Sequence, residues 1–179
     1  MSRISESTRR HKAEAPKQLR FGVFICSTSR YNQLKRGESV KDESGDLIEH
    51  FIKSSGHVLV FRKIISDDKA LIEQGVKEAM ESLNVDVVVF CGGTGIAPSD
   101  VTIETVSPFL EKTLPGFGEI FRFLSYNEMG SAAILSRAIA GTCKGKVFFC
   151  IPGSMEAVRL CFEKLILPEA AHIVKHARE

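Results

Sequence analysis

Apolar runs of strand length alternate with segments of helical periodicity along most of the chain. The runs are rich in Val, Ile and Phe, as strands buried on both faces are, and lie at 21–26, 58–65, 85–91 and 147–151. Apolar residues recur at helical spacing between the first three runs, over 42–56 and again over 71–84. This order predicts an α/β fold with parallel strands, right-handed crossovers and helices on both faces of the sheet.

The C-terminal half of the chain predicts a different arrangement. Its pattern indicates, in chain order, helices over 102–110 and 117–129 and a short strand over 137–142. Two further helices, beginning at Met155 and at Pro168, end the chain. Pro115-Gly116 is interpreted as a breaker between the first two helices. The short strand would form a hairpin with the run at 147–151. A mostly parallel sheet with one antiparallel hairpin is therefore expected.

The segment from 27 to 41 has no apolar periodicity and is predicted to be a loop. It carries Arg30, Lys35 and Arg36. Two interpretations of these charges stay open: a solvated loop, or a mobile flap over phosphates.

Composition limits the class of protein. Hydrophobic residues make up 44% of the 179 residues and charged residues 26%, which is typical of a soluble globular chain of one domain. The sequence contains neither an apolar run long enough to cross a membrane nor a secretory apolar segment. The five cysteines are widely spaced, at positions 26, 91, 143, 150 and 161. This spacing predicts reduced, buried thiols in a cytoplasmic protein.

Charge is distributed unevenly along the chain. Residues 1–20 hold six Lys or Arg and two Glu, although the net charge of the whole chain is only +2. Residues 1–19 are therefore predicted to form a basic arm, either disordered or in contact with another subunit. Residues 20–179 are predicted to form a single domain. Because the body of the protein is not basic, neither nucleic acid nor a membrane is expected as a partner.

Glycines follow the third apolar run, in the turn Gly92, Gly93, Thr94 and Gly95. Glycine lacks the Cβ atom that would block a sharp turn or the approach of a ligand. With Asp100 and a predicted helix after it, the turn has the layout of an anion site at a helix N-terminus. It matches neither the dinucleotide fingerprint nor the P-loop. An ordinary turn that happens to need glycine is the alternative.

Polar turns follow four of the predicted strands, at 27–29, 66–68, 92–100 and 152–154. In an open parallel sheet, ligands bind beyond the carboxyl ends of the strands, so these turns are expected to share one site. Two of them contribute acids, Asp67 and Asp100. Two carboxylates beside phosphate-sized turns indicate Mg²⁺ and a nucleotide. Each aspartate could instead cap a helix, with Glu104 as a capping partner. The histidines lie outside these turns, so no histidine base or metal cluster is assigned there.

Four segments together resemble the MoaB/Mog family of molybdenum-cofactor biosynthesis proteins: GGTGIAPSDVTIE, LPGFGEIFR, AILSRAIAG and IPGS. The resemblance runs from about residue 20 to about residue 165. It implies a three-layer α/β/α sandwich, a molybdopterin-binding domain, with molybdopterin and ATP as substrates and Mg²⁺ as cofactor. The implied reaction gives adenylyl-molybdopterin and pyrophosphate. A homotrimer or homohexamer is also implied, with Phe117 and Phe121 suited either to an interface or to the core. The metal-inserting enzyme that acts next is a further implied partner.

The resemblance assigns roles to individual residues. Asp67 and Asp100 are the implied catalytic and metal-binding acids. The implied binding residues are Ser27, Gly92, Gly93, Thr94, Gly95, Ser125, Ser136, Arg137, Pro152, Gly153 and Ser154. The chain departs from the family pattern at Ser66, where proline is usual, at Ser99, where many members have arginine, and at Thr28, where many have aspartate. A non-catalytic molybdopterin-binding or scaffold protein is therefore the alternative, and a nucleotide pyrophosphatase is a third hypothesis.

Overall fold

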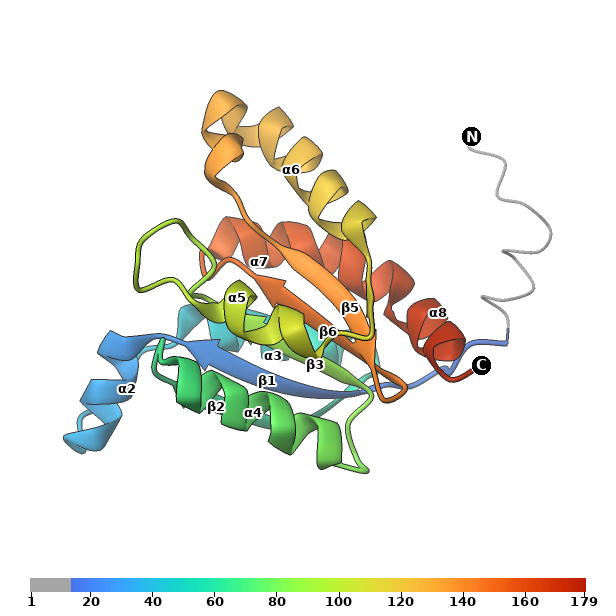
Figure 1. The fold of residues 1–179 in the computed structure, drawn as a ribbon, viewed down its shortest axis with the longest axis horizontal. Coiled ribbons are helices and arrows are strands. Elements are labelled where there is room, and N and C mark those ends of the chain that lie inside the picture. The colour runs from blue at the N-terminus through green and yellow to red at the C-terminus, as the bar shows by residue number, and fades with distance from the viewer. Residues whose placement is uncertain (1–13) are drawn as a thin grey trace.

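A six-stranded sheet organises residues 14–179, which are the residues that the computed structural model describes (Figure 1). Its strands are β1 Arg20–Cys26, β2 Val58–Ile65, β3 Val87–Cys91, β4 Lys112–Thr113, β5 Ile139–Cys143 and β6 Lys146–Ile151. They lie in the order β2-β1-β3-β6-β5-β4. The first four of this order are parallel, whereas β5 and β4 run antiparallel to their neighbours. The predicted hairpin is the β5–β6 pair.

Helices cover both faces of this sheet (Figure 1). They are α2 Thr28–Lys35, α3 Glu43–Ser54, α4 Lys69–Glu81, α5 Thr102–Val106, α6 Pro115–Met129, α7 Met155–Cys161 and α8 Leu167–Ala177. A π-helical stretch, Phe162–Ile166, joins α7 to α8. Short 3-10 stretches, Ser107–Phe109 and Gly130–Leu135, follow α5 and α6.

The core has two parts because strand residues alternate between the faces of the sheet. Val87 and Val89 face the cluster that holds residues of α3, α6, α7 and α8, whereas Val88 and Phe90 face the cluster under α4 and α5. Every residue of β3 is buried. This burial on both faces explains the continuous apolar run in the sequence and confirms the three-layer α/β/α sandwich.

The predicted loop at 27–41 is partly wrong, because its first half forms α2. None of the residues of α2 is buried, so the helix leaves no apolar stripe in the sequence. Two arginines of the 27–41 segment form ion pairs within or next to it: Arg30 lies 3.5 Å from Asp42, and Arg36, just after α2, lies 2.5 Å from Glu38.

Three predicted boundaries in the C-terminal half also need correction. Pro115 begins α6 rather than separating two helices, since proline fits the first turn, where no intrahelical N–H donor is needed. The helix predicted over 102–110 ends at Val106 and continues as a 3-10 turn. The short strand is Ile139–Cys143, and the two-residue, exposed β4 has no apolar pattern that could have predicted it.

The structure also tests predictions about individual residues. Phe121 is buried, and Phe117 is half-buried against Phe149, with ring centroids 5.1 Å apart, so core packing accounts for both. All five cysteines are buried and free. Residues 1–13 of the predicted arm lie outside the described residues, and Leu19 already packs in the core. Within residues 14–179, no helix is long and apolar enough to span a membrane.

Candidate functional site

The parallel strands end at one edge of the sheet. Cys26 pairs in register with Ile65, and Cys91 pairs with Ile151. The turns that follow are joined across these strand ends, because Ser27 N donates to Ile65 O and Gly92 N donates to Ile151 O, both at 2.9 Å. The four polar turns therefore share one edge, as the sequence predicted.

The backbone conformation and the close packing of the turn after β3 require glycine at its first two positions. Both have positive φ, +105° at Gly92 and +61° at Gly93. A Cβ atom at Gly92 would lie 2.3 Å from the backbone oxygen of Cys26. A Cβ atom at Gly93 would lie 2.6 Å from Asp67 Oδ1 and 2.5 Å from Thr102 Oγ1. These glycines therefore let the turn pack closely on its neighbours, which is the alternative that the sequence left open.

Asp67 lies beneath this turn and holds the start of α2. Its Oδ2 accepts hydrogen bonds from Thr28 N at 2.8 Å and from Thr28 Oγ1 at 3.1 Å. Capping of α4 falls to Asp68, which accepts from Leu71 N at 3.0 Å, so the capping alternative for Asp67 is wrong. Asp67 Oδ1 and Thr102 Oγ1 are buried without a hydrogen-bond partner among the described residues. A buried carboxylate oxygen without a donor suits a cation.

Asp100 closes its own loop rather than capping α5. Its Oδ2 accepts from Ala97 N at 2.9 Å, and the N-cap position of α5 is Val101, whose side chain makes no capping bond. The same oxygen would lie 2.6 Å from a Cβ atom at Gly95. The capping alternatives for Asp100 and Glu104 are therefore wrong. Glu104 instead pairs with Arg137 Nη2.

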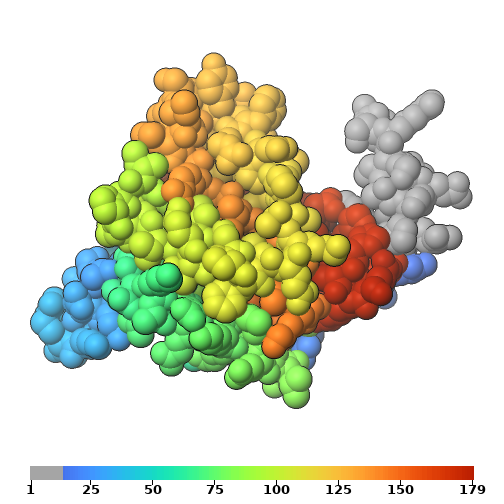
Figure 2. Space-filling view, viewed as in Figure 1, coloured from blue at the N-terminus to red at the C-terminus, as the bar shows by residue number. Residues whose placement is uncertain are grey.

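A cleft of about 360 Å³ lies above the glycine turn. We call it the glycine-turn cleft, and it is lined by Gly92, Gly93, Thr94, Gly95, Asp100, Leu135, Ser136, Arg137, Pro152 and Gly153. All of these except Leu135 were predicted from the sequence. Figure 2 shows the yellow-green residues after β3 at the surface, between the blue α2 and the orange segment after α6. The cleft therefore combines three separate stretches of sequence.

A smaller hollow of about 50 Å³ adjoins the cleft and shares Ser136 and Pro152 with it. Ser125 and Ser154 line this hollow. The Ser125 hydroxyl donates to Phe121 O at 2.8 Å, and Ser154 caps α7 by accepting from Ala157 N at 3.2 Å. Both hydroxyls are therefore already ordered by the protein before any ligand arrives.

Two of the predicted site residues, Ser27 and Asp67, line neither the glycine-turn cleft nor the smaller hollow beside it. Ser27 has its Oγ 3.3 Å from Ser29 Oγ, and Asp67 lies behind Gly93. Conversely, no sequence pattern predicts the contact of Ser44 with the turn after β6. Ser44 is buried, and its Oγ donates to Gly153 O at 2.6 Å. The two residues are 109 positions apart, so no sequence motif connects them.

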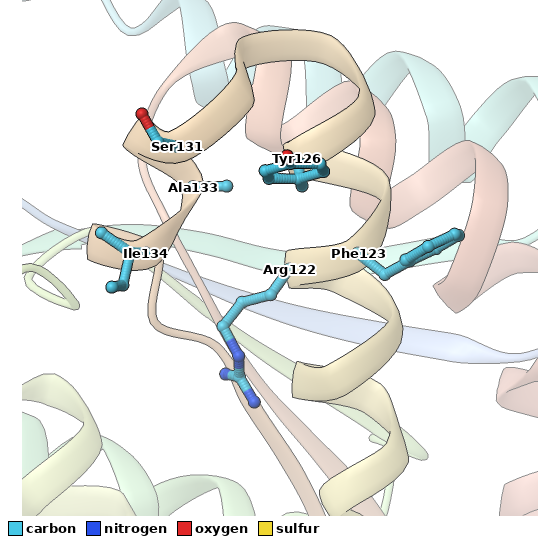
Figure 3. Close-up of a pocket in the computed structure, with 6 residues that line it drawn as sticks. All are labelled: Arg122, Phe123, Tyr126, Ser131, Ala133 and Ile134. Carbon is cyan, nitrogen blue, oxygen red and sulfur yellow. The ribbon is translucent and has the colours of Figure 1, made fainter.

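A third hollow of about 450 Å³ lies on the other side of α6, against the 3-10 stretch that follows it. It is lined by Arg122, Phe123, Tyr126, Ser131, Ala133 and Ile134, as Figure 3 shows. Phe123, Tyr126 and Ile134 have exposed fractions of 65%, 60% and 84%. We call this surface the apolar α6 face.

Comparison with known proteins finds a family model that covers most of the chain. Residues 22–172 match the family model described as "Probable molybdopterin binding domain". "Molybdenum cofactor biosynthesis protein B" of Bacillus cereus is 46% identical over 168 residues, covering 93% of this chain and 95% of the relative. "Molybdopterin adenylyltransferase" of Pyrococcus furiosus is 45% identical over 174 residues, covering 94% and 97%.

Solved structures agree with these sequence relatives. The crystal structure of the tungsten cofactor synthesizing protein MoaB from Pyrococcus furiosus has a TM-score of 0.81 at 43% identity, covering 92% of this chain and all of that one. A crystal structure of molybdenum cofactor biosynthesis protein B has a TM-score of 0.84 at 45% identity, covering 92% and 99%. The chain belongs to the MoaB/Mog family of molybdopterin-binding domains.

Proposed function

We propose that this protein is a molybdopterin adenylyltransferase in molybdenum-cofactor biosynthesis. Relatives of 43% and 45% identity carry the names "Probable molybdopterin adenylyltransferase" and "Molybdopterin adenylyltransferase". The observation that carries the proposal is the glycine-turn cleft, in which the glycine turn, Asp100, Ser136-Arg137 and Pro152-Gly153 meet. A nucleotide would occupy this cleft, and the pterin would extend toward Ser125 in the adjoining hollow.

The proposed reaction is an in-line attack of a terminal phosphate oxygen of molybdopterin on the α-phosphorus of ATP. The new P–O bond forms as the bond from the α-phosphorus to the bridging oxygen breaks, and pyrophosphate leaves. Little covalent chemistry falls to the protein in such a transfer, so positioning and charge neutralisation supply the catalysis. Backbone N–H groups of the glycine turn would stabilise the phosphates, and Arg137, held by Glu104, would add positive charge at the cleft.

The chemistry of two carboxylates supports Mg²⁺ as a ligand here, with Asp100 lining the cleft and Asp67 beneath the glycine turn against Gly93. Asp67 has a buried oxygen without a hydrogen-bond partner among residues 14–179, and Asp100 faces the cleft. Mg²⁺ usually takes one or two carboxylates together with phosphate oxygens. When bound, the ion would neutralise phosphate charge, and Asp67 and Asp100 are the residues that would hold it.

Asp100→Asn tests the proposal while keeping the hydrogen bond from Ala97 N. We expect pyrophosphate release from ATP in the presence of molybdopterin to fall at least a hundredfold, with molybdopterin binding retained. Asp68→Asn is the matched control, because Asp68 is exposed, caps α4 and does not line the cleft. A wild-type rate in Asp100→Asn would show that Asp100 has no catalytic role.

The second candidate is a non-catalytic molybdopterin-binding or scaffold protein. One observation favours it: Thr28 occupies one oxygen of Asp67, which leaves that carboxylate less free to hold a metal ion. Molybdopterin binding by the wild-type protein without any ATP-dependent release of pyrophosphate would support this candidate over the transferase.

The apolar α6 face is the surface that we propose for self-association. Its exposed Phe123, Tyr126 and Ile134 suit contact with a second copy of the chain better than contact with water. A homotrimer or homohexamer would bury them. Phe123→Asp should reduce the molar mass measured by light scattering, whereas an unchanged mass would place the interface elsewhere.

Three expectations remain predictions. The cytoplasmic location and the metal-inserting partner follow from the sequence and the resemblance alone. The division into an arm over 1–19 and a domain over 20–179 can be tested by deleting the first 13 residues and measuring stability. We expect the shortened chain to fold as the full chain does.

A further inference from the structure

Two glutamates line the smaller hollow beside the glycine-turn cleft, and the family resemblance assigns a role to neither. Glu128 reaches the hollow from the last turn of α6, and Glu156 reaches it from the first turn of α7. Neither lysine nor arginine lines it within residues 14–179. The hollow is therefore acidic, whereas Arg137 lines the cleft next to it.

An ion pair between two helices holds Glu128 in place. Arg159 Nη2, on α7, lies 2.9 Å from Glu128 Oε1, and Arg159 Nη1 lies 3.5 Å from Glu163 Oε2. The second oxygen of Glu128 and both oxygens of Glu156 have no hydrogen-bond partner in the part of the chain that the structure describes. These oxygens are available to accept hydrogen bonds from a ligand.

A buried hydroxyl adds a further acceptor to the hollow. Ser125 is only 3% exposed and already gives its proton to Phe121 O, so its oxygen can only accept from a molecule in the hollow. Ser154 Oγ accepts from Ala157 N, which leaves its own proton free to donate. The hollow thus offers mainly acceptors, and it favours a ligand edge that carries adjacent N–H groups.

A pterin has such an edge on its pyrimidine ring. The 2-amino group lies beside the N3–H, and a carbonyl oxygen follows at position 4. Carboxylates accept well from two parallel N–H groups, and the Ser154 hydroxyl would suit the carbonyl oxygen. Adenine lacks the pair of donors, because an unprotonated ring nitrogen lies beside its amino group. At about 50 Å³, the hollow is far smaller than the roughly 300 Å³ of a pocket that encloses a ligand, so only an edge of the ring would enter.

We propose that Glu128 and Glu156 determine the specificity of this hollow for a pterin, by accepting hydrogen bonds from its 2-amino group and N3–H. Arg159 is the positioning residue of Glu128. This assignment rests on the proposed function, in which molybdopterin extends from the cleft into the hollow.

The contrast in charge sets the direction in which the substrate lies. Ser136 and Pro152 belong to the linings of both the cleft and the hollow, so one molecule can span the two. A phosphate is repelled by the two carboxylates and attracted by Arg137. The pyrimidine end of the pterin would therefore enter the hollow, and its terminal phosphate would lie in the cleft.

Titration of the full-length protein with molybdopterin in the absence of ATP tests the assignment. Glu128→Gln and Glu156→Gln should each weaken binding at least tenfold, because each puts an amide in place of a charged acceptor. Glu163→Gln is the matched control, since Glu163 pairs with the same arginine but does not line the hollow, and it should change nothing. ATP binding, measured separately by calorimetry, should be the same in all three variants.

A pair of small ligands tests the contact with the 2-amino group itself. 6-Hydroxymethyllumazine differs from 6-hydroxymethylpterin by a carbonyl in place of that amino group. In competition with molybdopterin, the wild-type protein should bind the pterin at least tenfold better than the lumazine, because a buried acceptor facing a carbonyl is left unpaired. Either glutamine variant should lose most of this preference. Arg159→Gln should lose part of it, and Arg159→Lys should restore part.

The outcomes separate this inference from the proposed transferase activity. Neither binding assay contains ATP, so a protein that binds molybdopterin without adenylylating it would still show the preference. A wild-type protein that binds the two small ligands equally, or a preference that survives both glutamine substitutions, would overturn the assignment even if pyrophosphate release is normal. The comparison within the wild type decides the question if a variant fails to fold.

Discussion

Replacing Gly93 with alanine tests the close packing under the glycine turn. The backbone at Gly93 has a φ of +61°, and the added methyl group would lie 2.5 Å from Thr102 Oγ1 and 2.6 Å from Asp67 Oδ1. Both neighbours belong to side chains that the fold holds in place, since Thr102 is fully buried and Asp67 is bonded to Thr28. The substitution therefore adds steric overlap to backbone strain.

The expected cost has two parts. A left-handed conformation costs a non-glycine residue about 1–2 kcal/mol. Forcing a methyl group into filled space costs a further 1–3 kcal/mol, approximately. Gly93→Ala should therefore lower the free energy of unfolding by about 2–5 kcal/mol. Gly56 has a φ of +77°, but a methyl group there would meet nothing within 4 Å, so Gly56→Ala should cost only the first part, about 1–2 kcal/mol.

Urea unfolding of the two variants and the wild type separates these parts. We expect Gly93→Ala to be less stable than Gly56→Ala by about 1–3 kcal/mol, because only Gly93 faces a filled space. Pyrophosphate release should also fall in Gly93→Ala, since Asp67 must move, and stay near wild type in Gly56→Ala. If the two variants are equally stable, the packing argument for this turn is wrong.

Three further predictions concern other contacts. Ser44→Ala removes the bond to Gly153 O and should raise KM for ATP while costing about 1–3 kcal/mol in urea unfolding; Ser44→Thr should recover part of the loss if the hydroxyl matters. Burial acts to raise the pKa of Asp86, but hydrogen bonds from arginines, including Arg178, outweigh it and hold the pKa well below its usual range. The ionised Asp86 carboxylate therefore stabilises the folded protein fully above about pH 4, the usual pKa of aspartate, and this stabilisation is lost as pH falls through the lower pKa of the folded state. In urea unfolding, Asp86→Asn should lower the free energy of unfolding more at pH 7 than at pH 3. Because burial raises the pKa of the Cys26 thiol to about 12, a thiol reagent at pH 8 should label it only after unfolding, and fast labelling of the native protein would contradict its burial.

The strands, and the edge of the sheet that carries the cleft, could be predicted from the order of residues alone. Strands such as Val87–Cys91 are buried on both faces, so every residue is apolar and the run is visible without a structure. Parallel strands bring their carboxyl ends together, and this alone places Asp100 and Pro152-Gly153 in one cleft.

Features that depend on contacts between distant residues emerged only from the folded chain. Helix α2 buries none of its residues, so no periodic pattern marks it. The bond from Ser44 to Gly153 and the contact of Asp67 with Thr28 join segments 109 and 39 positions apart. Local patterns report burial, because burial repeats with the period of a helix or strand, whereas a single polar contact has no period to detect.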